Sequence, residues 1–368
     1  MDSQRLRPLL TARGPFASVY FEDSHDTPDA EAQLELRWRA IRDQLEELGA
    51  DEAVTADMER AVLDARPPVG RSGRGVVASA DGVMLNEHLI RPTATPVVRL
   101  SELPYVVPLV EHGFQDMNYL LVAVDHSGAD ITIHLNGTER TETVDGGGYP
   151  VHKASGAETS GYGDPQLRTE EAARKNLRAV ATRVEQLLGE VGPEAVFVMG
   201  EVRSRSDFVG LVPYQVQSLI DELEVGARHG GQDAEKVGQA IQAALLKRRL
   251  AAIDDAAQRF SAEVGRPSGL AAEGLGPVCS GLRQGAVDTL IIGDLGDETV
   301  VSDEELTTVA PNADVLSEQG AAPARTLRAD EALPMFAVSV GAALIRTDER
   351  IAPADGVGAV LRYSPTLH

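Results

Sequence analysis

The stretch of sequence that decides the fold is residues 119–145, which read YLLVAVDHSGADITIHLNGTERTETVD. It opens on an apolar run that ends at Asp125, a composition typical of a buried strand. Two turn signals, Ser127-Gly128 and Asn136-Gly137, separate this run from two further segments with strand patterning. The pattern predicts a meander of three antiparallel strands joined by tight turns.

A helix and a second buried strand are expected on the C-terminal side of this meander. Across residues 168–190, apolar residues recur at spacings of four and three, which is the period of one helix face. They are Ala173, Leu177, Val180, Val184 and Leu187. Residues 195–200, AVFVMG, are typical of a buried strand, and residues 201–207 are interpreted as a loop that caps the next helix.

The N-terminal side of the chain also alternates strand and helix patterns. The expected elements are a strand at 16–21, a helix carrying Leu34, Trp38, Ile41, Leu45 and Leu48, a second helix at about 51–65, and a hairpin of 75–79 and 83–90 around Asp81-Gly82. Pro67 and Pro68 end the second helix, because proline cannot continue it.

The C-terminal third carries a long helix and further strands. The helix is marked by the apolar stripe Leu246, Leu250, Ile253, Ala257, Phe260 and Val264, and strands are expected at 287–294, 336–340 and 358–363. Strands that alternate with helices predict an α/β fold of layered domains. We expect three α/β domains, at residues 1–113, 114–228 and 229–368.

The composition excludes several classes of protein. The 368 residues include 34 Lys and Arg against 57 Asp and Glu, a formal net charge of −23. The single cysteine, Cys279, leaves no disulfide framework and no cysteine metal cluster. No signal-peptide core and no apolar run near 18 residues is present, so a cytoplasmic protein without membrane contact is expected. Taken over the whole chain, the acidic balance argues against nucleic acid, whose phosphates attract Lys and Arg.

Signatures of common enzymes are missing from the sequence. It has no phosphate-binding G-x-x-x-x-G-K-[ST] run, no H-E-x-x-H zinc motif and no G-x-S-x-G nucleophile elbow. Gly274-Leu275-Gly276 resembles the start of a dinucleotide fingerprint, but Cys279 stands in place of its third glycine. Because the segment is expected to precede a strand rather than follow one, it is interpreted as a turn.

One set of carboxylates has a catalytic interpretation as well as a structural one. Asp125 at a strand end, with Glu170 or Glu171, would suit a metal-dependent nuclease. Strand ends and helix N-termini favour acidic residues in any protein, so the structural interpretation is preferred. The sequence therefore predicts no metal and no cofactor.

The Gly-rich stretch 145–166 is the most unusual segment. A loop longer than about 15 residues in a compact domain is usually functional or disordered. This one contains His152, Lys153 and Tyr162, whose side chains can contact phosphates and stack on bases. The alternative is a hairpin extension without a partner, and composition does not separate the two.

Charge is distributed unevenly along the chain. Residues 151–250 hold 13 Lys and Arg against 14 Asp and Glu, a net charge of −1, so the other residues carry −22. Arg174, Lys175 and Arg178 lie on the helix that follows the Gly-rich stretch. This segment is therefore the candidate for contact with an acidic partner, against the commoner alternative of a solvated helix face.

At this point the order of the parts resembles a known family. The chain is similar to the archaeal and eukaryotic peptide-chain release factors and Pelota, and more closely to their bacterial relatives, the Balon-like ribosome hibernation factors of mycobacterial type. Residues 119–200 resemble the middle domain of that family in order and spacing. Gly285-Ala-Val-Asp-Thr-Leu290, with 269–274 before it, resembles the start of the C-terminal domain. The N-terminal block resembles the family's N domain more weakly.

Two family motifs are altered here. Release factors read stop codons with a Thr-Ala-Ser-Asn-Ile-Lys-Ser string, whereas the matching junction is GADEAVT at 49–55. The family's catalytic Gly-Gly-Gln corresponds to GYGDPQ at 161–166, where Gln166 is displaced behind a proline. A literal Gly-Gly-Gln at 230–232 follows the whole middle domain, so it is interpreted as an interdomain turn.

The resemblance implies a protein that occupies the vacant A site of the 70S ribosome together with elongation factor Tu. It implies contacts with 16S rRNA at the decoding centre and with 23S rRNA at the peptidyl transferase centre, and a monomer away from the ribosome. No catalysis is needed for that role; the alternative is a peptidyl-tRNA hydrolysing release or rescue factor. The residues expected to bind rRNA are His152, Lys153, Tyr162, Gly163, Gln166, Arg174, Lys175 and Arg178, with Arg71 and Arg74 in the N-terminal block.

Overall fold

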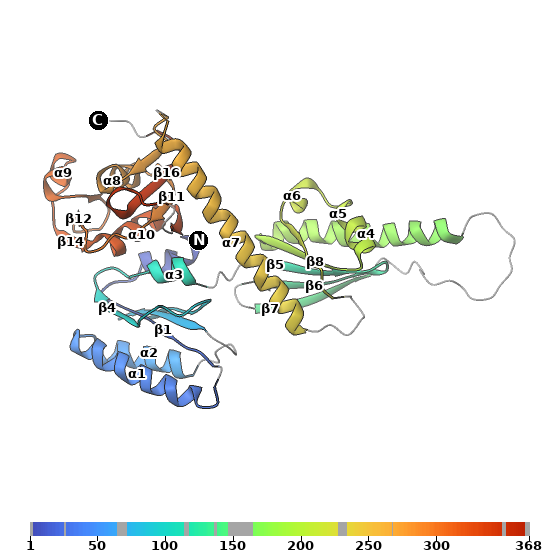
Figure 1. Ribbon diagram of the computed structural model, residues 1–368, viewed down its shortest axis with the longest axis horizontal. Helices are drawn as coiled ribbons and strands as arrows, with labels where there is room; N and C mark the ends of the chain where they lie inside the picture. The colour runs from blue at the N-terminus through green and yellow to red at the C-terminus, as the bar shows by residue number, and fades with distance from the viewer. Residues whose placement is uncertain are drawn as a thin grey trace. The chain divides into compact units, whose positions relative to one another are not determined.

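The computed structural model describes residues 3–25, 27–64, 72–113, 118–135, 138–145, 165–226, 234–266, 268–347 and 351–364, with only the backbone described at 165–169 and 234. The chain forms two compact units, one of Met1–Phe114 with Ala251–His368 and one of Gln115–Leu250 (Figure 1). Both combine helices with sheets, so the predicted α/β class is confirmed. The division into domains at 1–113, 114–228 and 229–368 stays a prediction.

Five strands form the sheet of the second unit, in the order β7-β6-β5-β8-β9. Their bounds are Tyr119–Val124 (β5), Gly128–Leu135 (β6), Thr138–Asp145 (β7), Ala195–Gly200 (β8) and Ile220–Glu222 (β9). β5, β6 and β7 pair antiparallel, so the predicted meander is confirmed. β8 lies parallel to β5, as expected for a strand reached through a helical crossover.

Helices cover both faces of this sheet. Helix α4 (Pro165–Val191) packs its predicted stripe on one face, where Leu177, Val180, Val184 and Leu187 are buried. Helix α7 (Ala234–Val264) starts on the other face, where Val237 and Ile241 pack with Phe197 and Met199. Because successive strand residues point to opposite faces, the continuous apolar run of β8 serves two cores.

The segment after β8 differs from its prediction. Residues 201–207, expected as a loop, contain most of helix α5 (Val202–Val209), and a short helix α6 (Tyr214–Gln217) follows. Within α5 only Ser204 and Phe208 are buried. A helix this short and exposed carries too few apolar residues to show a helical period in the sequence.

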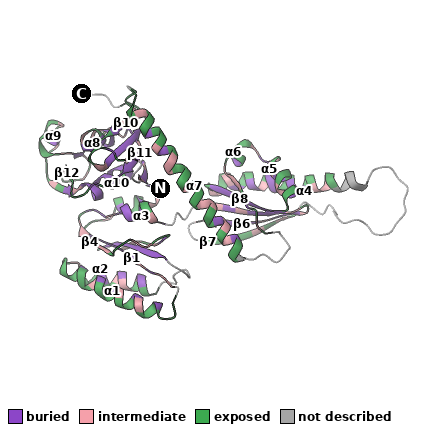
Figure 2. Cartoon of the chain, viewed as in Figure 1, coloured by how far each residue is buried: buried purple, intermediate pink, exposed green. Residues whose placement is uncertain are grey.

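The N-terminal part of the first unit is a four-stranded antiparallel sheet, ordered β3-β2-β1-β4. The strands are Phe16–Glu22 (β1), Gly73–Ser79 (β2), Gly82–Leu89 (β3) and Val97–Ser101 (β4). Helices α1 (Ala30–Glu47) and α2 (Glu52–Leu63) pack on one face around Trp38 and Met58, and the outer surface of both helices is exposed (Figure 2). The predicted strand, two helices and hairpin are confirmed.

The C-terminal part of the first unit holds two small sheets, ordered β10-β16-β11-β15 and β13-β12-β14. The strands are Ala271–Glu273 (β10), Val287–Ile292 (β11), Thr299–Ser302 (β12), Val309–Ala310 (β13), Arg325–Arg328 (β14), Ala343–Arg346 (β15) and Val357–Leu361 (β16). The helices are α8 (Leu275–Arg283), α9 (Ala313–Glu318), α10 (Ala329–Ser339) and the 3₁₀ turn η2 (Ala354–Gly356).

Two sequence predictions in this part are wrong. Residues 336–340 were expected as a strand, but residues up to Ser339 end helix α10, which is buried from Ala329 to Val338. A helix that is apolar all round shows no stripe, so its short runs resemble strands. Gly274-Leu275-Gly276, interpreted as a turn before a strand, instead follows β10 and begins α8, with Gly274 as the N-cap residue.

Segments far apart in the sequence share one core in the first unit. The 3₁₀ helix η1 (Ser3–Leu10) and helix α3 (Val107–His112) contribute apolar side chains to the cluster that contains the apolar residues of α8 and α10. Arg99 on β4 also donates to the carboxylates of Asp330 and Glu331 on α10, each at 3.0 Å, and lies 3.6 Å from the ring centroid of Tyr105. The two ends of the chain therefore stabilise each other.

Candidate functional site

The predicted rRNA-binding residues fall into three groups. His152, Lys153, Tyr162, Gly163 and Arg71 lie outside the described residues, as do the glycines and glutamine at 230–232. Gln166 lies in the first turn of α4, where only the backbone is described. Arg174, Lys175, Arg178 and Arg74 are described in full.

Three exposed cations of the second unit lie close together on the N-terminal half of α4. Arg174, Lys175 and Arg178 are all exposed, because the opposite side of the helix is held against the sheet by Leu177 and Val180. The side chains of Arg174 and Arg178 have no hydrogen bond or ion pair within the described part of the chain. The helix begins at Pro165, at the C-terminal end of the Gly-rich stretch. The three predicted residues therefore share one stretch of exposed helix.

Other arginines that add to the regional charge are bound within the unit. Arg183, further along α4, donates to Glu142 at 2.6 Å and to Glu190 at 2.9 Å, and these hydrogen bonds raise the pKa of its guanidinium. Arg205 donates to the carbonyl oxygen of Leu223 at 2.8 Å and to the Glu222 carboxylate at 3.2 Å. Fewer of the unit's arginines are therefore free than the sequence count suggests.

A groove of about 970 Å³ lies beside these cations, between the start of α4 and helix α5. Arg203 on α5 and Glu170 on α4 both line it, and Arg203 donates to Glu170 at 2.9 Å, a hydrogen bond that raises the pKa of Arg203. Arg174 lines the same groove, with His126, Ser204, Ser206 and Asp207 among the other lining residues. The groove thus combines one paired and one unpaired guanidinium with hydroxyl groups, which suits a polar partner.

The turn at Asp125 fixes one wall of the groove. Asp125 Oδ1 accepts hydrogen bonds from the backbone of Ser127 and Gly128, at 2.7 and 2.9 Å. Asn176 on α4 is 1% exposed and donates to the carbonyl oxygen of His126 at 3.1 Å. The buried amide therefore holds the basic helix against the end of β5.

The nuclease alternative finds no support in this geometry. The Asp125 carboxylate is engaged in its own turn, and the Glu170 carboxylate pairs with Arg203. Across the described ranges, no group of three or more His, Cys, Asp or Glu side chains is placed to hold a metal ion. Within the described part of the chain, Asp125 therefore has a structural role: it holds the turn after β5.

Arg74 corrects one of the predicted sites. It is fully buried on β2, where Nε donates to Asp23 at 2.7 Å and Nη1 donates to the Val62 carbonyl oxygen at 2.9 Å. Burial lowers the pKa of the guanidinium, and Asp23 opposes that shift. A side chain enclosed in this way stabilises the sheet and helix α2, and it presents no surface to RNA.

The groove residues on α5 were missed in the sequence. Arg203, Ser204, Ser206 and Asp207 were expected in a capping loop, so no common face was assigned to them. One signal was present in the sequence: a glycine, Gly200, ends the apolar run of β8. In the structure its φ is +137°, and a Cβ there would meet the Val124 carbonyl oxygen at 2.1 Å. Glycine at the end of a buried strand marks a close approach of two backbones, here of β8 to β5 just before α5.

No helix among the described residues is long and apolar enough to cross a membrane.

Comparison with known proteins identifies relatives of the whole chain. Residues 118–266 match the family model described as bacterial archaeo-eukaryotic release factor family 2. The uncharacterized proteins Rv2629 and MT2704 of Mycobacterium tuberculosis are each 50% identical over 366 residues, covering 100% of this chain and 98% of theirs.

Solved structures resemble the chain at low identity. An archaeal translation termination factor, aRF1, is 16% identical with a TM-score of 0.26, covering 99% of both chains. A ribosome-bound archaeal Pelota is 14% identical with a TM-score of 0.42, covering 99% of this chain and 94% of that one. Pelota of Archaeoglobus fulgidus is 11% identical with a TM-score of 0.36, covering 81% and 86%. These scores are too low to carry a functional argument.

Proposed function

The chain belongs to the bacterial archaeo-eukaryotic release factor family, and from that premise we propose that it acts on the ribosome as a hibernation factor that occupies the vacant A site. Its middle segment would contact 23S rRNA near the peptidyl transferase centre, and its N-terminal block would lie at the decoding centre in 16S rRNA. Elongation factor Tu accompanies it in this proposal, as the family resemblance implies. Occupancy alone blocks both centres, so no catalytic residue is required.

The observation that carries the proposal is the exposed basic stretch of α4. Arg174 and Arg178 are free of intramolecular partners among the described residues, in a chain whose net charge is −23. Unpaired guanidinium groups bind phosphate oxygens strongly and in pairs of hydrogen bonds. A helix that carries exposed, unpaired cations can insert into RNA while the acidic surfaces of the protein face protein or solvent.

The test is sedimentation of the full chain with purified vacant 70S ribosomes over a salt series. The triple variant R174Q/K175Q/R178Q is expected to bind at least about tenfold more weakly, with a slope of log K against log salt reduced by about three. The matched control R140Q/K236Q/K247Q removes the same charge from β7 and α7 and should keep the wild-type slope. Equal loss in both variants would mean that only overall charge matters, and the proposed contact would be wrong.

Two further experiments test the role of elongation factor Tu and the absence of catalysis. Adding elongation factor Tu should raise the bound fraction if it is part of the complex. Peptide release from stalled ribosome complexes distinguishes occupancy from the hydrolase alternative: robust hydrolysis that is lost in Gln166→Ala or Gln232→Ala would overturn occupancy in favour of a release or rescue factor.

A further inference from the structure

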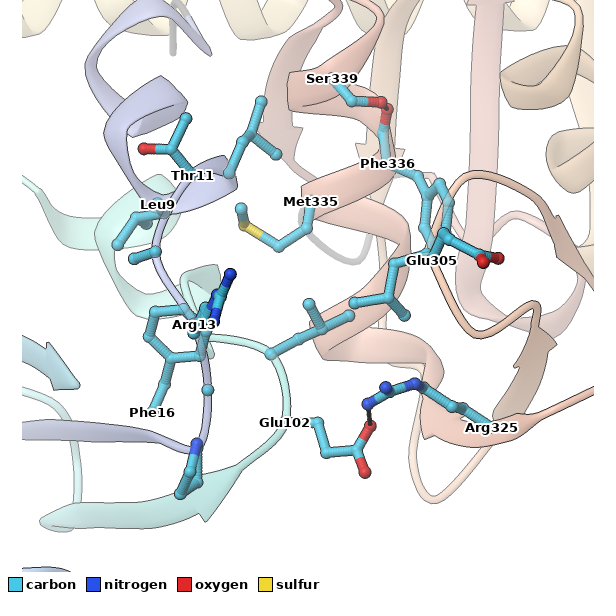
Figure 3. Close-up of a pocket in the computed structure, with 16 residues that line it drawn as sticks. Leu9, Thr11, Arg13, Phe16, Glu102, Glu305, Arg325, Met335, Phe336 and Ser339 are labelled. Carbon is cyan, nitrogen blue, oxygen red and sulfur yellow. Dashed lines mark hydrogen bonds and ion pairs between the residues drawn. The ribbon is translucent and has the colours of Figure 1, made fainter. Parts of the chain in front are cut away.

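A second cavity lies within the first unit, at the meeting of its N-terminal and C-terminal segments. It measures about 730 Å³ and is lined by the end of η1, the start of β1, the 305–306 turn and α10 (Figure 3). This volume lies within the range of small-molecule sites. Its walls include the buried apolar side chains of Leu9, Phe16, Leu103, Met335 and Phe336.

Arg13 supplies a free cation at this apolar cavity. Its backbone N–H donates to Asp81 at 3.2 Å, but its guanidinium has no hydrogen bond or ion pair with any residue that the structure describes. Figure 3 shows the guanidinium among the lining side chains, on the side of Phe16 and Met335. The cavity therefore presents one unpaired positive charge beside an apolar surface.

The other charged groups of the lining do not cancel Arg13. Glu102 is paired with Arg325 at 2.8 Å, and Arg325 also pairs with Glu304 at 2.6 Å. In Figure 3 the Glu305 carboxylate points away from Arg13, beyond the ring of Phe336. An anionic group beside Arg13 would thus meet a cation whose charge is not already neutralised.

The turn that carries Leu306 forms one wall of the cavity in a strained conformation. Leu306 has φ of +56°, which is unfavourable for a bulky side chain. Asp303 holds this turn, because its Oδ1 accepts from the backbone of Thr307 at 2.7 Å and of Thr308 at 3.0 Å. Strained residues held by their surroundings cluster at ligand clamps, and here the strain places a leucine in the lining.

From these observations we propose that the cavity binds a carboxylate amphiphile, with its apolar body against Phe16, Met335 and Leu306 and its carboxylate on Arg13. Guanidinium pairs with carboxylate through two parallel hydrogen bonds, and the apolar walls exclude water from the rest of the ligand. The chemistry is shared by a free fatty acid and by the C-terminus of an apolar peptide. This proposal does not depend on ribosome binding.

Isothermal titration calorimetry of the full chain with sodium decanoate tests the proposal. Saturable binding is expected, weakened about tenfold or more by Arg13→Gln, which removes the charge-assisted hydrogen bonds. Ser339→Trp, at an exposed lining position, should abolish binding by filling the cavity without changing charge. Arg7→Gln on η1, an exposed arginine outside the lining, is the matched control and should bind as wild type.

Two comparisons complete the experiment. Decanol has the same apolar chain and no charge, so it should bind wild type more weakly than decanoate does. Its affinity for Arg13→Gln should equal its affinity for wild type. The peptide N-acetyl-Leu-Leu-Phe, with a free C-terminus, is titrated beside decanoate, and the tighter of the two assigns the source of the carboxylate. No saturable binding by either, or equal losses in Arg13→Gln and Arg7→Gln, would overturn the proposal.

Discussion

Arg74 and Asp23 form an ion pair from which water is excluded, since both side chains are fully buried. Removing one partner of such a pair leaves an uncompensated charge in the interior, which is the main energetic cost. Their positions, 51 residues apart, join β2 to the end of β1 beside helix α2. At the residue scale, therefore, an arginine that suggests RNA binding in the sequence acts as a structural group.

Arg74→Gln is expected to lower the free energy of unfolding by about 3–5 kcal/mol, because Asp23 stays buried without its counter-charge. The double variant D23N/R74Q should recover part of that loss, since no charge is then left unpaired. Urea denaturation of the three proteins measures both changes. A loss below about 1 kcal/mol in the single variant would contradict the burial of the pair.

Cys279 provides a second prediction for a single residue. It is 1% exposed in α8, and burial raises the pKa of its thiol to about 12. Because the thiolate is the reactive form, labelling with Ellman's reagent at pH 8 should be roughly 1,000-fold slower in the folded protein than in denaturant. Fast labelling of the native protein would show that α8 opens far more readily than its packing indicates.

At the scale of elements, the sheet of the second unit depends on the close approach of β5 and β8. Gly200 ends β8 at φ of +137°, and a Cβ there would lie 2.1 Å from the Val124 carbonyl oxygen. Gly189 in α4 has ordinary helical backbone and open space around it. The same substitution therefore has opposite consequences in the strand and in the helix.

Gly200→Ala is expected to lower the free energy of unfolding by about 3 kcal/mol or more, through backbone strain and the steric clash with β5. Gly189→Ala should instead raise it by about 0.5–1 kcal/mol, because alanine loses less conformational entropy in a helix. Thermal and urea unfolding of both variants, followed by circular dichroism, checks the pair. Similar effects of the two substitutions would argue against the described register of β5 and β8.

The turn at 303–308 carries a prediction on pH. Burial raises the pKa of Asp303, but hydrogen bonds from Thr307 and Thr308 outweigh it and hold the pKa below its usual value. A carboxyl group with a lowered folded-state pKa stabilises the protein above its unfolded-state pKa of about 3.9, and that stabilisation is lost as pH falls through the folded-state value.

Asp303→Asn is therefore expected to cost about 1 kcal/mol at pH 7, a modest value because the carboxylate is partly exposed. The difference from wild type should shrink as pH falls below about 4. Urea unfolding of wild type and variant between pH 2.5 and 7 measures it. A difference that grows toward low pH would contradict the predicted direction.

At the scale of the whole molecule, the first unit joins residues from both ends of the chain. One apolar cluster contains Leu9 and Phe16 from the N-terminal part and Val278 and Leu333 from the C-terminal part. Arg99 adds two ion pairs from β4 to α10. The second unit, Gln115–Leu250, has separate clusters around its own sheet.

A fragment of residues 115–250 is therefore expected to fold alone and to melt cooperatively. Residues 1–113 alone would expose the apolar face that the C-terminal part covers, so this fragment should bind a hydrophobic dye or aggregate. Circular dichroism melting and dye fluorescence of the two fragments make the test. If 1–113 melts cooperatively without dye binding, the three-domain division predicted from sequence is the better description.

The sequence by itself determined the elements whose signal is local. The meander at 119–145, the stripe of α4 and the hairpin around Gly82 follow from periods of two and about three and a half residues and from turn chemistry, which depend only on neighbours along the chain. The same local signals failed for α10 and α5, because one is apolar all round and the other is short and exposed.

Only the tertiary structure decided which charges are free and which segments share a core. Arg183 meets Glu142 and Arg74 meets Asp23 across 41 and 51 residues, whereas Arg174 and Arg178 meet no such partner among the described residues. The cavity beside Arg13 likewise exists only where η1 and α10 pack together. Such pairings depend on how distant segments close on one another, and no local period in the sequence records that closure.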